Sequence, residues 1–394
     1  MNNEEVVIVA AKRTPTANML GNLSSLTAPE LGAIAHKAAI EQAGIDPNDI
    51  DEVISGCVLQ AGIGQAPARQ AALKANIPNT KGATTINKMC GSGMKAVMLG
   101  HDLIKAKSAQ IILAGGMESM SNAPYLLSKA RSGYRLGHGE LKDHMFLDGL
   151  EDAYDRGKLM GVFAEATAKH YNFTREQQDE FAIRSLKLSI EAEEKGKFAH
   201  EIAPVTLQDK KGETIIRKDE GPDAAKIAKI PNLKPAFQAD GTVTAANSSS
   251  ISDGAASLIL MTAAEAQKRN LPILAKIVAH ATHAHEPQWF TTAPVKAIRN
   301  VLNKSGWTTD QVDLYEINEA FAVVAMAAIK DLELELGKVN IHGGACALGH
   351  PIGASGARIL VTLIHALRQN NKKRGVAALC IGGGEATAIA VEVV

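Results

Sequence analysis

The spacing of apolar residues along this chain predicts strands that alternate with helices. The uninterrupted apolar run from Val6 to Ala11 is typical of a strand inside a sheet that is covered on both faces. Residues Ala28 to Ala43 are predicted to form a helix, because Thr27 is a suitable N-cap and Gly44 a suitable C-terminal stop. Further strands are expected at Val53 to Leu59, Gln110 to Ala114, Ser257 to Met261, Ile273 to Ala281, Val312 to Ile317 and Val376 to Cys380, and further helices at Pro67 to Ala75, Met94 to Lys105, Arg175 to Lys195 and Ala357 to Gln369. This alternation indicates parallel βαβ units.

The last part of the chain repeats the order of elements around Cys90. In the first copy, the turn Cys90-Gly91-Ser92-Gly93 precedes a helix and a strand that is expected to end at Gly115-Gly116. In the second copy, Gly353-Ala354-Ser355-Gly356 precedes a helix and a strand that ends at Gly382-Gly383-Gly384. A repeat of this size predicts two halves of similar fold that face each other. A site between them would take residues from both halves.

The region from Glu118 to about Lys234 has a different character, with charged and Met-rich segments between loops. One amphipathic helix is clear there, because Thr174 and Gln177 form a capping-box pattern at its start. We interpret this region as an inserted layer that rests on the α/β core.

Composition excludes several classes of function. The chain is 46% hydrophobic, which is enough for large cores, and its 42 basic and 42 acidic residues give no electrostatic reason to expect nucleic acid or membrane partners. The four cysteines stand far apart, so they indicate neither a disulfide framework nor a C-x-x-C metal site. No apolar run reaches membrane-spanning length, and the N-terminus lacks the basic region of a signal peptide. We therefore expect a reducing, cytoplasmic location.

Cys90 lies in a glycine-rich turn directly before a predicted helix. The unpaired N–H groups and the dipole at a helix N-terminus favour negative charge, so a thiol there is expected to lose its proton easily and to act as a nucleophile. The alternative is a buried structural cysteine beside a turn, which is the commoner role of a free cysteine.

Four segments of the chain combine polar groups with turns between regular elements, where open α/β sheets bind ligands. They are the Cys90 turn, Asn318-Glu319-Ala320-Phe321, Gly349-His350-Pro351 and Cys380-Ile381-Gly382-Gly383-Gly384. Taken singly, Asn318 could be a helix cap, His350 a loop histidine and the glycines a tight turn. Together the segments supply a nucleophile, a base, a second thiol and backbone N–H donors, which are the parts of acyl-transfer catalysis.

These segments resemble the motifs of the thiolases, a family that makes and breaks 3-oxoacyl-CoA by Claisen chemistry. The matching stretches are Asn87-Lys88-Met89-Cys90-Gly91-Ser92-Gly93, Asn318-Glu319-Ala320-Phe321, Gly349-His350-Pro351-Ile352-Gly353-Ala354-Ser355-Gly356 and Cys380-Ile381-Gly382-Gly383-Gly384. The resemblance implies an α/β fold in which duplicated βαβ halves form an αβαβα core of five layers with an inserted loop layer. We expect residues 1–118 and 246–271 to form the N-terminal half, 119–245 the inserted CoA-binding layer and 272–394 the C-terminal half.

The resemblance also implies a role for each polar residue. Cys90 would attack the thioester and carry the acyl group, and His350 would take the thiol proton and polarise the substrate oxygen. Cys380 would remove a proton from the second acetyl-CoA. Asn318 would hold a water that stabilises the enolate, and the N–H groups of Cys90 and Gly382 would form an oxyanion hole.

Coenzyme A is implied as substrate and product, so no metal and no bound organic cofactor are expected. The loop from Thr242 to Ser250 resembles the pantetheine-contacting loop. Pro124 to Asp143 resembles the loop that joins two dimers, so a homotetramer is expected, with a dimer as the alternative. The implied contacts with CoA or the acyl group are Ser249, Leu150, Met160, Phe237, Ala245, Ala320 and Phe290.

Some positions depart from the short-chain biosynthetic thiolases. Leu159 replaces a histidine, and Phe290, beside Trp289, replaces a methionine of the acyl pocket. The arginine that those thiolases have on the adenine side of CoA falls near Pro222 of this chain. His342 and Cys346 replace an asparagine and an aliphatic residue.

The favoured function is reversible condensation of two acetyl-CoA to acetoacetyl-CoA and CoA. A degradative 3-oxoacyl-CoA thiolase of broader chain length is the main alternative, in which case the loop at Phe290 would line a longer pocket. A catalytically silent binding protein and a cysteine hydrolase are more remote, because the active-site set is complete and includes a second cysteine.

Overall fold

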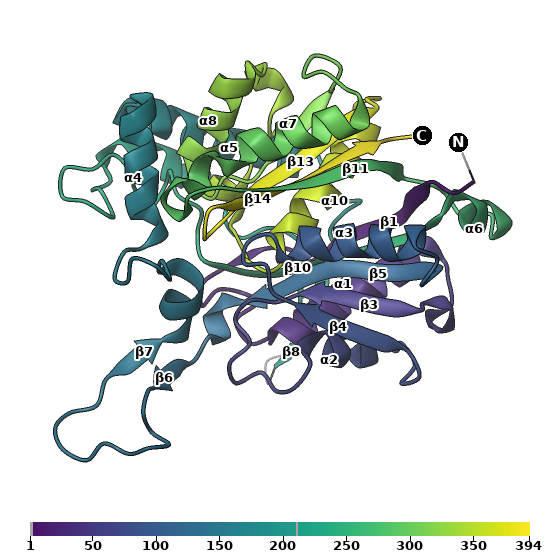
Figure 1. The fold of residues 1–394 in the computed structure, drawn as a ribbon, viewed down its shortest axis with the longest axis horizontal. Helices are drawn as coiled ribbons and strands as arrows, with labels where there is room; N and C mark the ends of the chain where they lie inside the picture. Colours follow the sequence, from purple (N-terminus) through teal and green to yellow (C-terminus); the bar gives the residue numbers. More distant parts are fainter. Residues whose placement is uncertain (1–2, 210–211) are drawn as a thin grey trace.

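Two similar α/β halves lie edge to edge in the computed structural model, which describes residues 3–209 and 212–394 (Figure 1). The strands of the first half are β1 (Val6–Arg13), β2 (Ala17–Asn18), β3 (Glu52–Gly56), β4 (Gly82–Ile86), β5 (Ile111–Ser119) and β10 (Ser252–Thr262). Those of the second half are β11 (Ala275–Ala284), β12 (Leu314–Ile317), β13 (Arg374–Ile381) and β14 (Glu385–Glu392).

The strand order confirms the repeat that the sequence predicts. The first half runs β4-β3-β5-β10-β1 and the second half runs β12-β13-β14-β11. In both halves a parallel pair (β3 with β5, β12 with β13) is followed by two antiparallel pairs, and in the first half β4 adds a second parallel pair with β3. The halves meet where β1 pairs with β11 over two residues, Val7 with Lys276 and Ile8 with Ala275.

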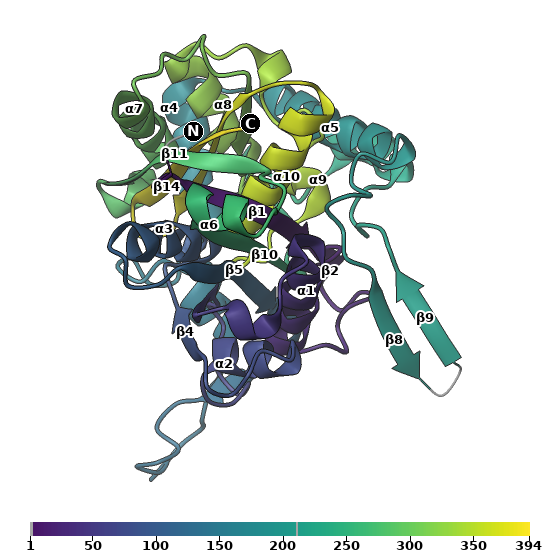
Figure 2. The ribbon, with the colours of Figure 1, turned by 90° about the vertical axis from the view of Figure 1, so that its right-hand side faces the viewer.

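Helices and sheets stack in the five layers that the resemblance implies (Figures 1 and 2). The middle layer holds α3 (Ser92–Lys105) and α10 (Ser355–Gln369), whose apolar residues share one core with both sheets. The outer helices are α1 (Ala28–Ala43) and α2 (Pro67–Lys74) on the first sheet and α7 (Ala293–Ser305) and α8 (Ala322–Leu332) on the second. The expected αβαβα core is therefore confirmed.

Glycines allow α3 and α10 to approach each other closely at their N-termini. A Cβ atom on Gly93 would lie 2.9 Å from the backbone nitrogen of Ala357, and one on Gly356 would lie 2.5 Å from that of Met94. Any larger residue would force the helices apart. The two turns that carry Cys90 and His350 are therefore brought together by this contact.

The helix predicted at Ala28 to Ala43 is confirmed, and Gly44 ends it in the left-handed conformation. The predicted end of the strand at Ala114 was wrong, because β5 continues through Gly115 and Gly116 to Ser119. These glycines do not break the strand. They allow neighbouring backbone to approach, since a Cβ atom on Gly115 would lie 2.0 Å from the carbonyl oxygen of Ala256.

The strand predicted at Val53 to Leu59 ends earlier, at Gly56. The backbone N–H groups of Val58 and Leu59 donate instead to the carboxylate of Glu118, at 3.0 and 3.1 Å. A side chain thus takes the hydrogen bonds that a continuing strand would have used.

The segment between β5 and β10 lies at one end of the layers and includes two projecting hairpins (Figures 1 and 2). The predicted capped helix is present as α5, with Thr174 accepting from the Gln177 N–H. The four-part division of the chain stays a prediction.

The remaining elements include β6 (Tyr125–Leu127), β7 (Leu141–Asp143), α4 (Met160–Tyr171), α5 (Arg175–Glu194), β8 (Val205–Asp209), β9 (Gly212–Ile216), α6 (Ala263–Lys268) and α9 (Ala345–Leu348). Among the described residues, the helices lack the combination of length and apolar character that crossing a membrane requires.

Candidate active site

The polar residues singled out in the sequence lie where a strand ends or where a helix is about to begin. These positions are at the same edge of the two halves. Cys90 follows β4, Asn318 follows β12, and Cys380 lies in the last two residues of β13. Strands β12 and β13 are parallel, with Ile317 opposite Ala378, so Asn318 and Cys380 emerge side by side. The Asn318 N–H donates to the Ala378 carbonyl at 3.0 Å.

The Cys90 turn is shaped by local backbone conformation. Met89 adopts a left-handed φ of 48°, and a Cβ atom on Gly91 would lie 2.4 Å from Cδ1 of Ile381. The backbone N–H of Gly382, in the other half, lies close enough to the Cys90 sulfur to lower its pKa. This contact joins the proposed nucleophile to the glycine turn after β13.

The expectation that Cys90 loses its proton easily was wrong for the resting protein. Burial raises the pKa of the thiol to about 11, and Glu118 adds to that rise. The backbone N–H groups of Gly382 and of Cys90 itself lower the pKa, but they do not offset the loss of water around the sulfur. The nucleophile therefore needs a base that removes its proton during the reaction.

The imidazole of His350 is arranged as such a base. Its Nδ1 lies 2.5 Å from Oγ of Ser355, and that hydroxyl donates to the Pro351 carbonyl at 2.9 Å. Because the single hydroxyl hydrogen is used there, Nδ1 must carry the imidazole proton and donate it to Ser355. The Nε2 atom then has a free lone pair, is buried and has no partner in the described structure. Burial lowers the pKa of His350 to about 3, so the ring is neutral at physiological pH.

Cys380 is buried at the end of β13, close enough to Cys90 for the two to affect each other's charge. Burial, with a smaller effect of Cys90, raises the pKa of the Cys380 thiol well above its ordinary value. Both thiols are therefore protonated at rest.

Asn318 presents an uncommitted amide. Its side-chain Nδ2 and Oδ1 are both buried and have no hydrogen-bond partner within the described residues. A buried polar group without a partner costs about 1–3 kcal/mol, so native proteins rarely keep one unless a ligand or water uses it. The carboxylate of Glu319 next to it is fully committed and accepts from Ser185, Asn340 and Cys346.

Two groups that sequence reasoning missed hold the site together. The buried carboxylate of Glu118 accepts N–H groups from Val58, Leu59 and, at 2.8 Å, Gly353 of the other half. Burial raises its pKa to about 7. The second group is Ser355, which sets the tautomer of His350. The sequence contained a signal for Glu118, because it is a charged residue at the end of an apolar strand. For Ser355 the sequence contained no signal other than the motif to which it belongs.

The predicted substrate contacts fall in three places. Met160, Phe237, Ala320 and Phe290 belong to the apolar cluster that includes Cys380, and Met160 Sδ would lie 3.4 Å from a Cβ atom on Gly382. Leu150 packs in the cluster that contacts Cys90. The Ser249 N–H donates to the Ala320 carbonyl at 2.9 Å.

Ala245 lies outside the apolar cluster and lines a cavity of about 250 Å³ together with Lys226, Lys229 and Ser250. This cavity adjoins the catalytic loop, since the Ser250 carbonyl accepts the His350 N–H at 3.1 Å. A larger groove, of about 1310 Å³, runs along α4 and contains none of the four polar residues of the site. None of these four residues lines the smaller cavity either, but its lining residue Ser250 is hydrogen-bonded to the His350 backbone.

Comparisons with known proteins decide the family. The thiolase N-terminal domain family matches residues 6–264, and the thiolase C-terminal domain family matches residues 271–393. The chain belongs to the thiolase family. This family assignment covers nearly the whole chain and includes all four motifs.

Several proteins similar to this thiolase are named acetyl-CoA acetyltransferase. One from Pseudomonas aeruginosa is 48% identical over 388 residues, which cover 98% of both chains. Acetyl-CoA acetyltransferase 2 of Arabidopsis thaliana is 50% identical over 396 residues, covering 100% of this chain and 98% of the relative. A crystal structure of the Bacillus anthracis acetyl-CoA acetyltransferase superposes with a TM-score of 0.96 at 41% identity and covers 99% of each chain.

The pKa of Cys90 gives a prediction for its reactivity. Alkylation of Cys90 by iodoacetamide should accelerate about tenfold per pH unit between pH 7 and 10, because the thiolate fraction rises tenfold per unit below a pKa of about 11. The rate at Cys90 is followed by mass spectrometry of its peptide. A plateau near pH 8 would show instead that the resting sulfur is already a thiolate paired with imidazolium.

Proposed function

We propose that this member of the thiolase family is an acetyl-CoA C-acetyltransferase that condenses two acetyl-CoA to acetoacetyl-CoA and CoA, reversibly. The observation that carries the proposal is the meeting of the Cys90 sulfur with the Gly382 N–H beside a second buried thiol, Cys380. The names of the relatives support the same reaction.

In the first half-reaction Cys90 attacks the carbonyl carbon of acetyl-CoA. A bond forms between Sγ and the acetyl carbon, and the bond from that carbon to the CoA sulfur breaks. The thiol proton passes to the free Nε2 of His350 and then to the departing CoA thiolate. The N–H groups of Cys90 and Gly382 stabilise the negative oxygen of the tetrahedral intermediate.

In the second half-reaction Cys380 first passes its thiol proton to His350 Nε2, and the resulting thiolate removes a proton from the methyl group of another acetyl-CoA. The resulting enolate oxygen accepts a hydrogen bond from His350 Nε2, which now carries that proton, and another from a water bound to the uncommitted amide of Asn318. The methyl carbon attacks the acetyl-enzyme carbonyl, and the bond to Cys90 breaks to release acetoacetyl-CoA. The proton on His350 passes to the Cys90 sulfur and the methyl proton stays on Cys380, so both thiols and the neutral imidazole are restored. One covalent intermediate in two steps gives ping-pong kinetics.

Coenzyme A needs a path from solvent to these residues. The cavity lined by Lys226 and Lys229 suits its phosphate end, because the two lysines supply positive charge where the biosynthetic relatives carry an arginine near Pro222. The apolar residues Met160 and Phe237 suit the pantetheine arm near Gly382. We propose that the reaction uses no metal and no organic cofactor, since the residues named here account for each proton and bond.

The acyl pocket is proposed to be short. Phe290 is 3% exposed and packs edge to face with Phe163, with ring centroids 6.4 Å apart, in the cluster that contains Cys380. These rings fill the space that a longer acyl chain would occupy. Broad chain length, as in a degradative thiolase, would require them to move.

The function is tested by thiolysis of 3-oxoacyl-CoA substrates of increasing length with the purified protein and CoA. The proposal predicts that activity is confined to acetoacetyl-CoA and its nearest homologues. Activity that extends to long chains would establish the degradative alternative. No activity at any length, in folded protein with Cys90 reduced, or hydrolysis that outpaces transfer to CoA, would overturn the enzyme assignment.

Phe290→Ala tests the source of chain-length selection. We expect the ratio of kcat/KM for 3-oxohexanoyl-CoA to that for acetoacetyl-CoA to rise about 10-fold or more, because an added methylene is worth roughly 1–3 kcal/mol in an apolar pocket. The ratio is informative even though removing a buried ring lowers stability by about 3–5 kcal/mol. An unchanged ratio would place the limit on chain length elsewhere.

A homotetramer in the cytoplasm, with a role in fatty acid metabolism, completes the proposal. Strand β4 ends the first half's sheet and leaves an edge free for pairing with a second copy. The four cysteines are unpaired, as a reducing compartment would keep them. The hairpin of β6 and β7 projects from the body (Figure 1) and exposes apolar side chains, with Leu136 97% and Leu141 65% exposed.

The hairpin is predicted to join two dimers. Replacing Leu136 and Leu141 with serine should convert the tetramer to a dimer, because their burial between copies would be lost, while the thiolysis rate per chain stays within about threefold. Light scattering after size exclusion measures the mass. Leu336→Ser, which changes an exposed leucine elsewhere, should leave the tetramer intact. A tetramer that survives the hairpin change would show that another surface joins the dimers.

A further inference from the structure

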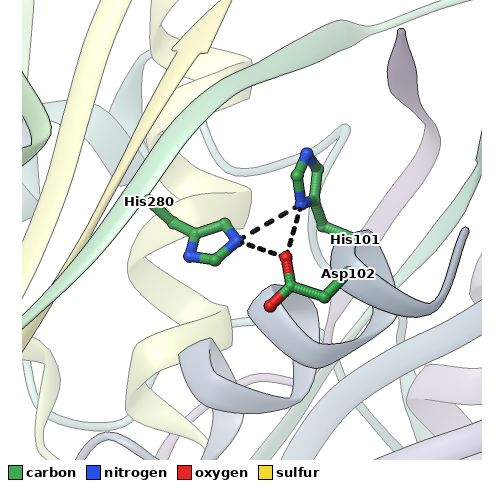
Figure 3. Close-up of side chains that lie close together, drawn as sticks. All are labelled: His101, Asp102 and His280. Atoms are coloured by element: carbon green, nitrogen blue, oxygen red, sulfur yellow. Dashed lines mark hydrogen bonds and ion pairs between the residues drawn. The ribbon is translucent and has the colours of Figure 1, made fainter. Parts of the chain in front are cut away.

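Three potential metal ligands meet at the end of α3 that is distant from Cys90. His101 and Asp102 lie in the last turns of α3, and His280 lies on β11 of the second half. Figure 3 shows that the three side chains converge across the boundary between the halves. His101 is nine residues from Ser92, so the cluster lies about 14 Å along the helix from the catalytic turn.

The ligand atoms are spaced as a metal would hold them. Asp102 Oδ1 lies 2.9 Å from His280 Nε2 and 3.1 Å from His101 Nδ1, and the two ring nitrogens are 3.2 Å apart. Zinc binds nitrogen and oxygen at about 2.0–2.2 Å, which puts neighbouring ligand atoms of a tetrahedral or octahedral site about 2.9–3.4 Å apart. The spacing of the three atoms therefore matches that of three ligand atoms on one face of such a site.

The donor set and its surroundings fit a divalent transition ion. Two imidazole nitrogens and one carboxylate oxygen suit zinc. Magnesium and calcium prefer oxygen ligands, so this set of ligands does not favour them. The imidazoles are largely buried, with 16% and 15% of the side chains exposed, whereas Asp102 is 52% exposed and leaves an open path from solvent. The two rings stand nearly perpendicular, at 86°, which directs both nitrogens to one point.

Without a metal the same groups can form hydrogen bonds in which both rings donate to Asp102. That arrangement leaves the two ring nitrogens 3.2 Å apart with no proton between them. A metal removes this repulsion, since both lone pairs then point at a cation. Lys304, whose Nζ donates to the His280 carbonyl at 3.0 Å, is the one nearby positive charge given by these contacts and will weaken binding somewhat.

We propose that His101, Asp102 and His280 bind one zinc ion through three protein ligands, and that the ion joins the two halves of the fold. The remaining coordination positions face solvent and take water. The ion is distant from Cys90 and His350, so its effect is on the stability of the contact between α3 and β11. This inference does not depend on the proposed function.

The test is a titration of the reduced, chelator-treated, full-length protein with Co²⁺, a spectroscopic substitute for Zn²⁺, followed by displacement with Zn²⁺. We expect one Co²⁺ per chain, visible bands typical of nitrogen and oxygen ligands, and a dissociation constant at least about 10-fold larger in His280→Gln. Zn²⁺ should raise the unfolding temperature of the native protein but not that of His280→Gln.

His283→Gln is the matched control, because it changes a histidine of the same strand that lies against His285 rather than His101. It should bind Co²⁺ like the native protein. Equal binding by the native protein and His280→Gln, the sulfur-to-cobalt charge-transfer band of a thiolate ligand, or no bound Co²⁺ would each overturn the proposal. Because metal binding is read directly, these outcomes are separate from those of the activity assays.

Discussion

Replacing Cys90 with alanine is expected to lower the rate of acetoacetyl-CoA thiolysis by about 10⁴-fold or more. The variant has no sulfur to hold the acyl group. The nucleophile and its base work together, so the loss of the nucleophile alone removes most of the catalysis that the covalent pathway provides. The measurement is kcat with acetoacetyl-CoA and CoA.

The fold should survive this substitution, because Cys90 is half-buried and alanine introduces no clash. An unfolding temperature within a few degrees of the native value is the control. A Cys90→Ala protein that keeps more than about a tenth of the native rate would show that the chemistry does not pass through this sulfur.

Replacing Cys380 with serine is expected to separate the two half-reactions. Condensation and thiolysis should fall by about 10²–10⁴-fold, because a serine hydroxyl is a much weaker proton acceptor in the same place. Exchange of labelled CoA into acetyl-CoA needs only Cys90 and His350 and should continue. Both rates are measured on the same preparation.

The split between the rates is what identifies Cys380 as the base for carbon–carbon bond chemistry. A variant that merely disturbs the fold would lose both reactions together. Full condensation activity in Cys380→Ser would contradict the role assigned to this residue.

Much of the architecture follows from the sequence because its signals are local. The capped helix from Ala28 to Ala43 is marked by residues at its own ends. The repeat is marked by two similar turns, but the parallel βαβ units that the alternation predicted account only for the parallel pairs, and β10, β1, β14 and β11 join the sheet in antiparallel pairs.

The errors arose where distant parts of the chain determine local structure. Gly115 looked like a strand end, but a neighbouring strand packs against it so closely that glycine is required. Leu59 looked like part of a strand, but its N–H donates to Glu118, 59 residues along the chain. Neither partner is visible in the local pattern.

The candidate site was predicted by residue type but not in its electrostatics. The helix N-terminus suggested an acidic thiol at Cys90, whereas burial dominates its pKa. Ser355 sets the protonated nitrogen of His350 through a hydrogen bond that a sequence does not specify. His280 lies 179 residues from His101, so their meeting also required the structure.

The most direct test of the account is mass spectrometry of the protein after brief incubation with acetyl-CoA and rapid quenching in acid. The account predicts a gain of one acetyl group per chain, located on the Cys90 peptide, that disappears when free CoA is added before the quench. Cys380→Ser should trap the same species. Turnover of acetyl-CoA with no acetyl group on Cys90, or with the group on another residue, would contradict the central claim.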